Sequence, residues 1–138
     1  MRVGDLPGLI ADRDLAAVND ELTVLDAAEM MTDRHIGAVI ALRAGRMSGI
    51  FTERDLMTRV VVPGLDVRTT CVADVMSRAV ATVTVDEPVE TCLSRMREGG
   101  FRHLPVVDAD GEPFAMLSQR DFLTRDGESA ALAFGTAG

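Results

Sequence analysis

The amino-acid sequence contains two copies of one pattern, offset by 66 residues, and this repeat constrains the fold more than any other feature. When residues 18–59 are aligned with residues 84–125 without a gap, eight of the 42 positions are identical. Arg54-Asp55 then aligns with Arg120-Asp121, and Gly45 aligns with Gly111. Because the identities cluster at turn and motif positions, we expect two copies of one supersecondary unit.

The length of 138 residues suits one domain or two small halves that share a core. We predict a first unit over residues 1–62, a linker over 63–71, a second unit over 72–125 and a C-terminal tail over 126–138. The turn-forming residues Pro63 and Gly64 mark the joint between the two copies.

Each copy is expected to have the element order β-α-β-β-α, which gives a mixed α/β (α+β) fold. In the second copy, the β-branched run 80–85 predicts a strand, and the acidic residues and proline of 86–88 predict the start of a helix. Strands are expected at 104–107 and 114–117, around a hairpin turn at 108–111, with a helix from Ser118. In the first copy, strands are expected at 15–18, 38–42 and 48–51, and helices at 22–31 and from Thr52.

Each copy also carries a Ser/Thr-x-x-Asp motif where a predicted strand meets a predicted helix: Thr52-x-x-Asp55 and Ser118-x-x-Asp121. One interpretation is a capping box, in which these side chains bind backbone N–H groups at the start of the helix. The other is a ligand site, in which the carboxylate accepts hydrogen bonds from the hydroxyls of a ribose. The two roles are compatible, because the hydroxyl and the carboxylate need not point the same way.

The ordered set of motifs resembles the cystathionine-β-synthase-type (CBS) domain in its usual tandem pair. The stretches that carry the resemblance are 35–39, 49–51 and 52–56 in the first copy, and Val75-Met76-Ser77, 80–83, 102–108 and 118–122 in the second. The resemblance covers residues 6–125. It implies two pseudo-symmetric units packed as a CBS pair (a Bateman-type module), a homodimer of such pairs, and adenine-nucleotide sites in the cleft between the units.

In this resemblance, Asp55 and Asp121 match the aspartate that contacts the ribose. Arg54 and Arg120 lie near helix N-termini, where backbone N–H groups favour anions, and arginine forks match phosphate oxygens. The alternative for each arginine is a surface ion pair in a chain with excess acid. The predicted ligand-binding residues are Thr52, Arg54, Asp55, Ala38, Val80, Ala81, Thr82, Arg102, His103, Leu104, Pro105, Ser118, Arg120 and Asp121.

The apolar slot for the base is assigned to Val80, Ala81 and Thr82 with Leu104 and Pro105. The first copy departs from this pattern, with Asp14 in place of Val80 and Val39 in place of Pro105. Because an acid near the slot would repel phosphate, we expect the second site to be the stronger one. The second copy departs too, since Ala115 stands where the family usually places glycine.

Composition excludes several other functions. All 14 basic residues are arginine, and the chain contains no lysine, tyrosine or tryptophan, so Schiff-base and phosphate-loop lysines are absent. A net charge of −8 argues against binding to nucleic acid or to an anionic membrane. The sequence has no signal-peptide pattern and no long apolar run, so we expect a cytoplasmic protein.

No catalytic constellation is recognisable, so an enzyme is not expected. His35 and His103 lack a third ligand at useful spacing, so no metal site is predicted and a surface or phosphate-facing position is favoured. Cys92 suits a core position, whereas Cys71 is a thiol in the linker. The main hypothesis is a sensor with no required cofactor and an adenine nucleotide (AMP, ADP or ATP) as regulatory ligand, acting on an unknown protein target. The alternative is a ligand-free interaction or stress-response module that acts through its dimer surface.

Overall fold

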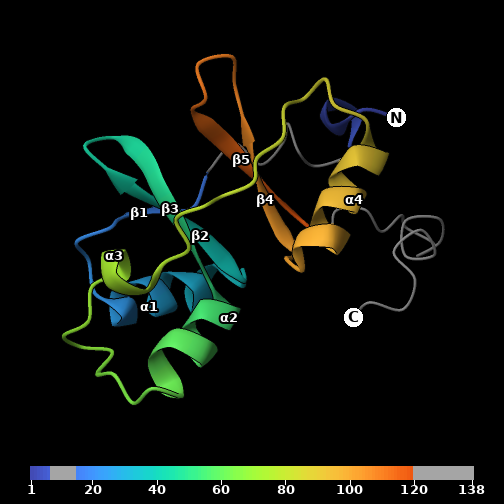
Figure 1. Ribbon diagram of the computed structural model, residues 1–138. Coiled ribbons are helices and arrows are strands. Elements are labelled where there is room, and N and C mark those ends of the chain that lie inside the picture. Colours follow the sequence, from blue (N-terminus) through green and yellow to red (C-terminus); the bar gives the residue numbers. More distant parts are fainter. Residues whose placement is uncertain (7–14, 120–138) are drawn as a thin grey trace. The chain divides into compact units, whose positions relative to one another are not determined.

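The computed structural model describes residues 1–6 and 15–119, and its contacts divide them into two compact units (Figure 1). Residues 16–80 form one unit, here called the central unit. Residues 1–6, 15 and 81–119 belong to the other, here called the terminal unit. The division therefore does not follow the order of the repeats: the start of the chain joins the second repeat, and the first residues of the second repeat join the first.

The central unit is built on a three-stranded sheet in the order β1-β2-β3. The strands β1 (Ala17–Asn19) and β2 (Ala38–Arg43) are parallel, whereas β2 and β3 (Arg46–Thr52) form an antiparallel hairpin. The crossover between β1 and β2 is the helix α1 (Val24–Arg34), which begins at a capping box formed by Thr23 and Asp26. Short helices α2 (Glu53–Asp55) and η2 (Leu56–Val61), the latter π-helical, follow β3, and α3 (Val72–Val75) follows the linker.

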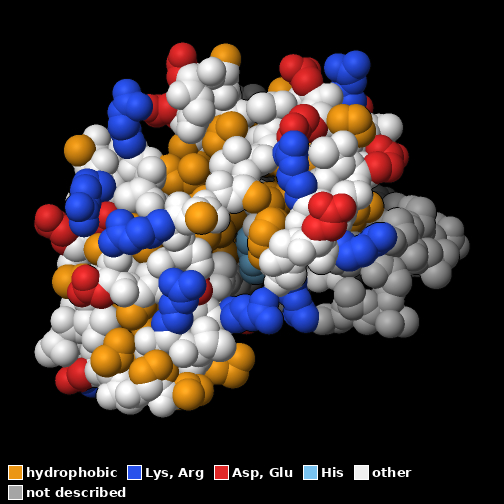
Figure 2. Space-filling model, viewed as in Figure 1, with side chains coloured by type: hydrophobic (Ala, Val, Ile, Leu, Met, Phe, Trp, Pro, Cys, Tyr) orange, Lys and Arg blue, Asp and Glu red, His pale blue; other side chains and the backbone are white. Residues whose placement is uncertain are grey.

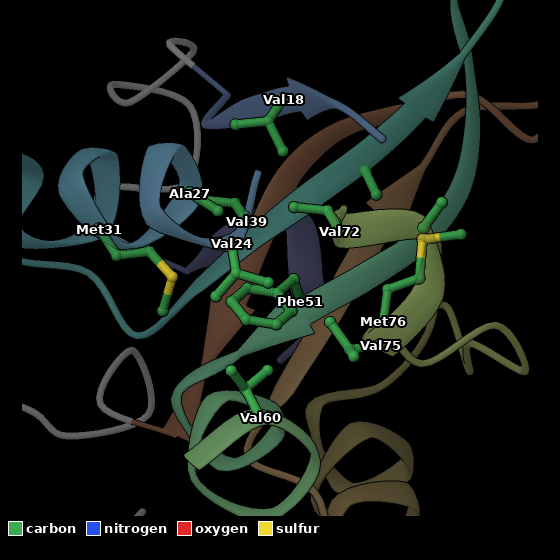
Figure 3. Close-up of a cluster of buried hydrophobic side chains, with 12 residues drawn as sticks. Val18, Val24, Ala27, Met31, Val39, Phe51, Val60, Val72, Val75 and Met76 are labelled. Atoms are coloured by element: carbon green, nitrogen blue, oxygen red, sulfur yellow. The ribbon is translucent and has the colours of Figure 1, made fainter. Parts of the chain in front are cut away.

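The core of the central unit surrounds Phe51, which is fully buried (Figure 3). Val24, Ala27 and Met31 reach this core from α1, and Val60 reaches it from η2. Val72, Val75 and Met76 complete it, although they belong to the second repeat in sequence. Each fully buried aliphatic side chain contributes roughly 1.5–3 kcal/mol, so this short segment supplies a substantial part of the unit's stability.

The backbone ties the same segment to the sheet. Ser77 and Ile50 exchange two N–H···O=C hydrogen bonds, each 2.9 Å long. A Cβ atom on Gly49 would lie 2.6 Å from the carbonyl oxygen of Ser77, so this close approach requires glycine. Residues 76–77 are therefore held against β3 by both packing and backbone pairing.

The terminal unit consists of the hairpin β4 (His103–Val107) and β5 (Pro113–Ser118), the helix α4 (Val89–Gly99) and the N-terminal turn η1 (Val3–Asp5) (Figure 1). The helix ends at Gly100, whose φ of 69° is left-handed. Val3 and Leu6 pack in one core with Leu93, Met96 and Leu104. The N–H groups of Val3 and Gly4 donate to the carbonyl oxygens of Glu87 and Val85, at 2.9 Å each, which fastens the chain start to the second repeat.

The predicted strand over 80–85 is not a strand; Val83 alone makes a parallel bridge, to Val106. The physical reason is that side chains bind the neighbouring backbone groups: Arg95 donates to the carbonyl of Thr82, and Glu87 accepts from the N–H of Thr84. The helix predicted from residue 86 begins at Val89, because Pro88 has an extended backbone as the N-cap residue.

The other predicted elements of the first repeat exist with shifted ends. The strand expected at 15–18 is β1, the helix expected at 22–31 is α1, and the strands expected at 38–42 and 48–51 are the longer β2 and β3. Ser118, the predicted start of the second helix of the second repeat, is the last residue of β5, and the rest of this helix after Gln119 lies outside the described residues, as does the tail. None of the described helices is long and apolar enough to cross a membrane.

Candidate functional site

The predicted ligand-binding residues are distributed over both units. Thr52, Arg54, Asp55, Ala38 and Val80 lie in the central unit. Ala81, Thr82, Arg102, His103, Leu104, Pro105 and Ser118 lie in the terminal unit. Arg120 and Asp121 lie outside the described residues, so their assignment stays a prediction.

In the central unit, Thr52 and Asp55 form a complete capping box. The N–H of Asp55 donates to Oγ1 of Thr52, and the N–H of Thr52 donates to Oδ2 of Asp55, both at 3.1 Å. The structure thus confirms the capping interpretation of this motif. The Asp55 carboxylate has further acceptor sites beyond the one used in the cap.

The remaining acceptor sites of Asp55 are approached by two residues outside the predicted ligand-binding set. The Ser77 hydroxyl donates to Oδ1 at 3.1 Å and lies 3.3 Å from Oδ2. Nε of Arg59 lies 3.6 Å from Oδ1, and its NH1 donates to the carbonyl of Met76 at 3.0 Å. We call Thr52, Asp55, Arg59 and Ser77 the Asp55 cluster. Within it the Asp55 side chain is 7% exposed.

Sequence signals existed for only one of these two partners. Arg59 stands four residues after Asp55, a spacing at which opposite charges on a helix pair. Ser77 is 22 positions from Asp55, and nothing in a single sequence predicts that the lead-in of the second repeat returns to the first. The contact of Ser77 with Asp55 follows from its backbone pairing with Ile50.

Other predicted residues of the central unit are arranged around this cluster. Ala38 is buried in β2 and lies opposite Thr52 in the β2–β3 hairpin. Arg54 is exposed in α2, next to Asp55. On the face shown in Figure 2, arginine and acidic side chains are interspersed, as expected where arginines pair with nearby acids.

At one end of the terminal hairpin, three predicted residues come together. His103 lies opposite Ser118 in the β4–β5 ladder, and the carbonyl of Arg102 accepts from the N–H of Gln119 at 2.9 Å. Arg102, His103 and Ser118 are therefore neighbours in the backbone at the point where β5 ends. Leu104 and Pro105 are buried in β4, and Leu104 is part of the hydrophobic core.

A bidentate ion pair positions the half-buried segment that contains Ala81 and Thr82. NH1 and NH2 of Arg95 donate to the two carboxylate oxygens of Glu87 at 2.8 and 2.9 Å, and NH1 also donates to the carbonyl of Thr82 at 2.8 Å. This hydrogen bond lowers the pKa of Glu87, against a smaller opposing effect of burial, and raises that of Arg95. The sequence pattern did not predict this pair, because Glu87 precedes the helix that carries Arg95.

A hollow of about 280 Å³ opens elsewhere in the central unit, at the C-terminal end of α1. Met31, His35 and Ile36 line it together with Glu53 and Leu56, and none of the predicted ligand-binding residues does. Among residues 1–6 and 15–119, no three His, Cys, Asp or Glu side chains are grouped as metal ligands would be.

Comparison with known proteins shows which protein family this chain resembles. The family model of the CBS domain matches the chain twice, at residues 3–62 and 72–128. A CBS domain-containing protein of Arabidopsis thaliana is 41% identical over 101 residues, which cover 72% of this chain and 19% of the relative. The chain thus spans about a fifth of that relative's length.

Solved structures of similar proteins agree with this match. A CBS-domain containing protein from Agrobacterium tumefaciens is 30% identical, with a TM-score of 0.79 over 88% of this chain and 95% of its own. A CBS domain protein from Pyrobaculum aerophilum, solved in complex with AMP, is 25% identical, with a TM-score of 0.80 over 99% of this chain and all of its own. Both the repeat and its fold are therefore shared with known proteins.

Proposed function

The chain belongs to the CBS domain family, and from this we propose that it is a non-enzymatic sensor that binds an adenine nucleotide of the AMP, ADP or ATP type. The observation that carries the proposal is the AMP complex of the Pyrobaculum aerophilum protein, which is similar over the whole of this chain's length. The chain is a CBS pair, a regulatory module.

The residues that would hold the ligand are those of the two Ser/Thr-x-x-Asp motifs and their neighbours. Asp55 and Asp121 would accept the ribose hydroxyls, while Arg102, His103 and Arg120 would bind phosphate in the second site. Arg54 would do so in the first site. Ala81 and Thr82 would contact the base, and the Arg95–Glu87 pair supports this assignment by holding the backbone of Thr82 in place.

Thermal unfolding in the presence of AMP, ADP, ATP, NAD and S-adenosylmethionine tests the proposal. A ligand at 100 times its Kd stabilises the folded state by about 2.7 kcal/mol. We expect AMP, ADP or ATP to raise the Tm, and we expect Asp121→Ala to reduce this shift more than Asp55→Ala, because the Asp55 carboxylate already has partners in its own unit. The absence of any Tm shift at millimolar ligand would reject the sensor.

The second candidate function is a ligand-free interaction module, and exposed apolar side chains favour it. Met57, Val61 and Val62 in and after η2 are 58%, 61% and 76% exposed, and Leu65 is 44% exposed. Met57 and Val61 stand four residues apart, which places them on one side of η2, whereas Val62 and Leu65 follow the end of this helix. We propose that a second copy of the chain covers them, forming a homodimer in the cytoplasm.

Analytical ultracentrifugation tests the dimer. Val61→Asp should shift the protein to the monomer, because a carboxylate would be buried in an apolar contact. Val85→Asp, at a side chain that is 37% exposed in the terminal unit, is the control and should leave the dimer intact. Sedimentation of the unmodified chain as a monomer at micromolar concentration would contradict the assignment.

A further inference from the structure

Ser77 has a fixed position against the Asp55 carboxylate. Its backbone is paired with Ile50 by two hydrogen bonds, and Gly49 permits the close approach of the two segments. Its hydroxyl lies 3.1 and 3.3 Å from the two carboxylate oxygens of Asp55. The backbone pairing therefore holds the hydroxyl near the carboxylate, so less side-chain entropy is lost when it donates to Asp55.

The Asp55 carboxylate would have to share its acceptor sites between this donor and a ribose. A carboxylate offers about four lone-pair sites. The N–H of Thr52 occupies one on Oδ2, the Ser77 hydroxyl lies against both oxygens, and Arg59 approaches Oδ1. The two hydroxyls of a ribose would require both oxygens. The donor that can leave at least cost is Ser77, since Thr52 belongs to the helix cap and Arg59 carries a charge.

We propose that Ser77 is a built-in competitor for the ribose contact at Asp55, and that it sets the nucleotide affinity of the first site. The inference rests on the proposed nucleotide function. Occupancy of the site would exchange an internal hydrogen bond for ligand contacts, so part of the binding free energy is consumed in displacing the serine hydroxyl. The same exchange removes one of the contacts that hold residues 76–77 on the central unit, so ligand binding and the attachment of this segment are coupled.

The competing serine is present at the first site, and the second site has no serine at the corresponding position. In the 66-residue register, the position of Ser77 corresponds to Ala11, and alanine has no hydroxyl to donate. A nucleotide at Asp121 would therefore meet no equivalent donor at that position. This difference gives a physical basis for unequal affinities at two sites whose Ser/Thr-x-x-Asp motifs are otherwise alike.

The test measures AMP binding by isothermal titration calorimetry in an Asp121→Ala background, where the remaining binding reports on Asp55. Ser77→Ala should tighten AMP roughly three- to tenfold, the value of one hydrogen bond no longer displaced. Ser77→Thr keeps the hydroxyl and should leave the affinity unchanged. Ser48→Ala is the matched control, because it removes a 2.9 Å serine–carboxylate bond at Asp20 in the same unit. The gain in affinity from Ser77→Ala should be smaller for 2′-deoxy-AMP, because this nucleotide lacks one of the two ribose hydroxyls.

The outcomes separate this inference from the function on which it rests. If neither the unmodified chain nor any variant binds AMP, both fail. If the unmodified chain binds AMP but Ser77→Ala leaves the affinity of the Asp121→Ala protein unchanged, only the competitor fails. A gain that persists after Asp55→Asn would also overturn it. Thermal unfolding monitors the fold of each variant. If Ser77→Ala is unstable, Ser77→Cys replaces it: the thiol is a weaker donor of similar size, so this variant should also bind AMP more tightly.

Discussion

Nε of Arg43 lies 3.1 Å from Oδ2 of Asp20, a carboxylate with no exposure to solvent. The Ser48 hydroxyl donates to the same oxygen at 2.9 Å. The backbone of Asp20 is also engaged: its N–H donates to Leu42 and its carbonyl accepts from Ala73, each at 2.8 Å. Asp20 therefore joins all three strands of the central sheet to the first turn of α3.

Asp20→Asn should lower the free energy of unfolding by about 2 kcal/mol, because the hydrogen bonds from Arg43 and Ser48 lose their charged acceptor. Urea denaturation measures the change. Asp86 occupies the same position in the second repeat, but its side chain is 83% exposed, so Asp86→Asn is the control and should change stability by less than about 0.5 kcal/mol. Equal losses in the two variants would contradict the assigned importance of burial.

Gly49→Ala should destabilise the central unit by about 1–3 kcal/mol. The added Cβ would lie 2.6 Å from the Ser77 carbonyl oxygen and 2.8 Å from Sδ of Met76. We expect faster hydrogen exchange at the amides of Ser77 and Ile50, whose mutual hydrogen bonds must lengthen. Unchanged hydrogen-exchange rates at both amides would show that the segment shifts to accommodate the Cβ atom and keeps these hydrogen bonds.

Glu87→Gln should reduce the loss in the free energy of unfolding that occurs as the pH falls below neutral. The Arg95 guanidinium lowers the pKa of Glu87 in the folded state, so the unfolded chain binds the proton more readily. The stabilisation is complete above the ordinary glutamate pKa of about 4.3 and is lost as the pH falls through the folded value. At pH 7 the variant should be less stable by about 1 kcal/mol, the size of one partly exposed ion pair.

Urea midpoints between pH 7 and pH 3 measure this difference. The gap between Glu87→Gln and the unmodified chain should narrow toward the acid end. Glu98→Gln, at an exposed position of α4, serves as the control and should retain the full pH dependence. A gap that stays constant across the range would show that the ion pair does not contribute.

Cys92 should resist modification in the folded protein. Burial raises the pKa of its thiol to about 11, with a smaller contribution from Glu87, so almost no thiolate exists at pH 8. Cys71 is only partly buried. Ellman's reagent should therefore label Cys71 first. In about 6 M guanidinium, where the chain is unfolded, both thiols should react completely. Rapid labelling of folded Cys71→Ser protein would contradict the burial of Cys92.

Much of the fold was predictable because the repeat and its periodicities are local properties of the chain. The helices at Val24–Arg34 and Val89–Gly99 and the two hairpins carry their own caps, turns and apolar patterns. The capping role of Thr52 and Asp55 also followed from their spacing. The failure at residues 80–85 came from side chains, Arg95 and Glu87, that replace a strand partner and leave no trace in a strand pattern.

Differences between the two copies were the least predictable part. An ungapped alignment implies equal hairpin registers, yet Thr52 lies opposite Ala38 whereas Ser118 lies opposite His103, one residue away from the equivalent of Ala38. Turn length and bulges decide such offsets, and a shift by 66 residues cannot detect them. The contact between Ser77 and Asp55 was hidden for a related reason, since it connects the two copies and is internal to neither.

The exchange of lead-in segments has a consequence for how such a chain can be divided. A polypeptide cut within residues 63–71 would leave its first piece without Val72, Val75 and Met76, and its second piece without Val3 and Leu6. Neither fragment could close its core alone, but the two could complement each other when mixed.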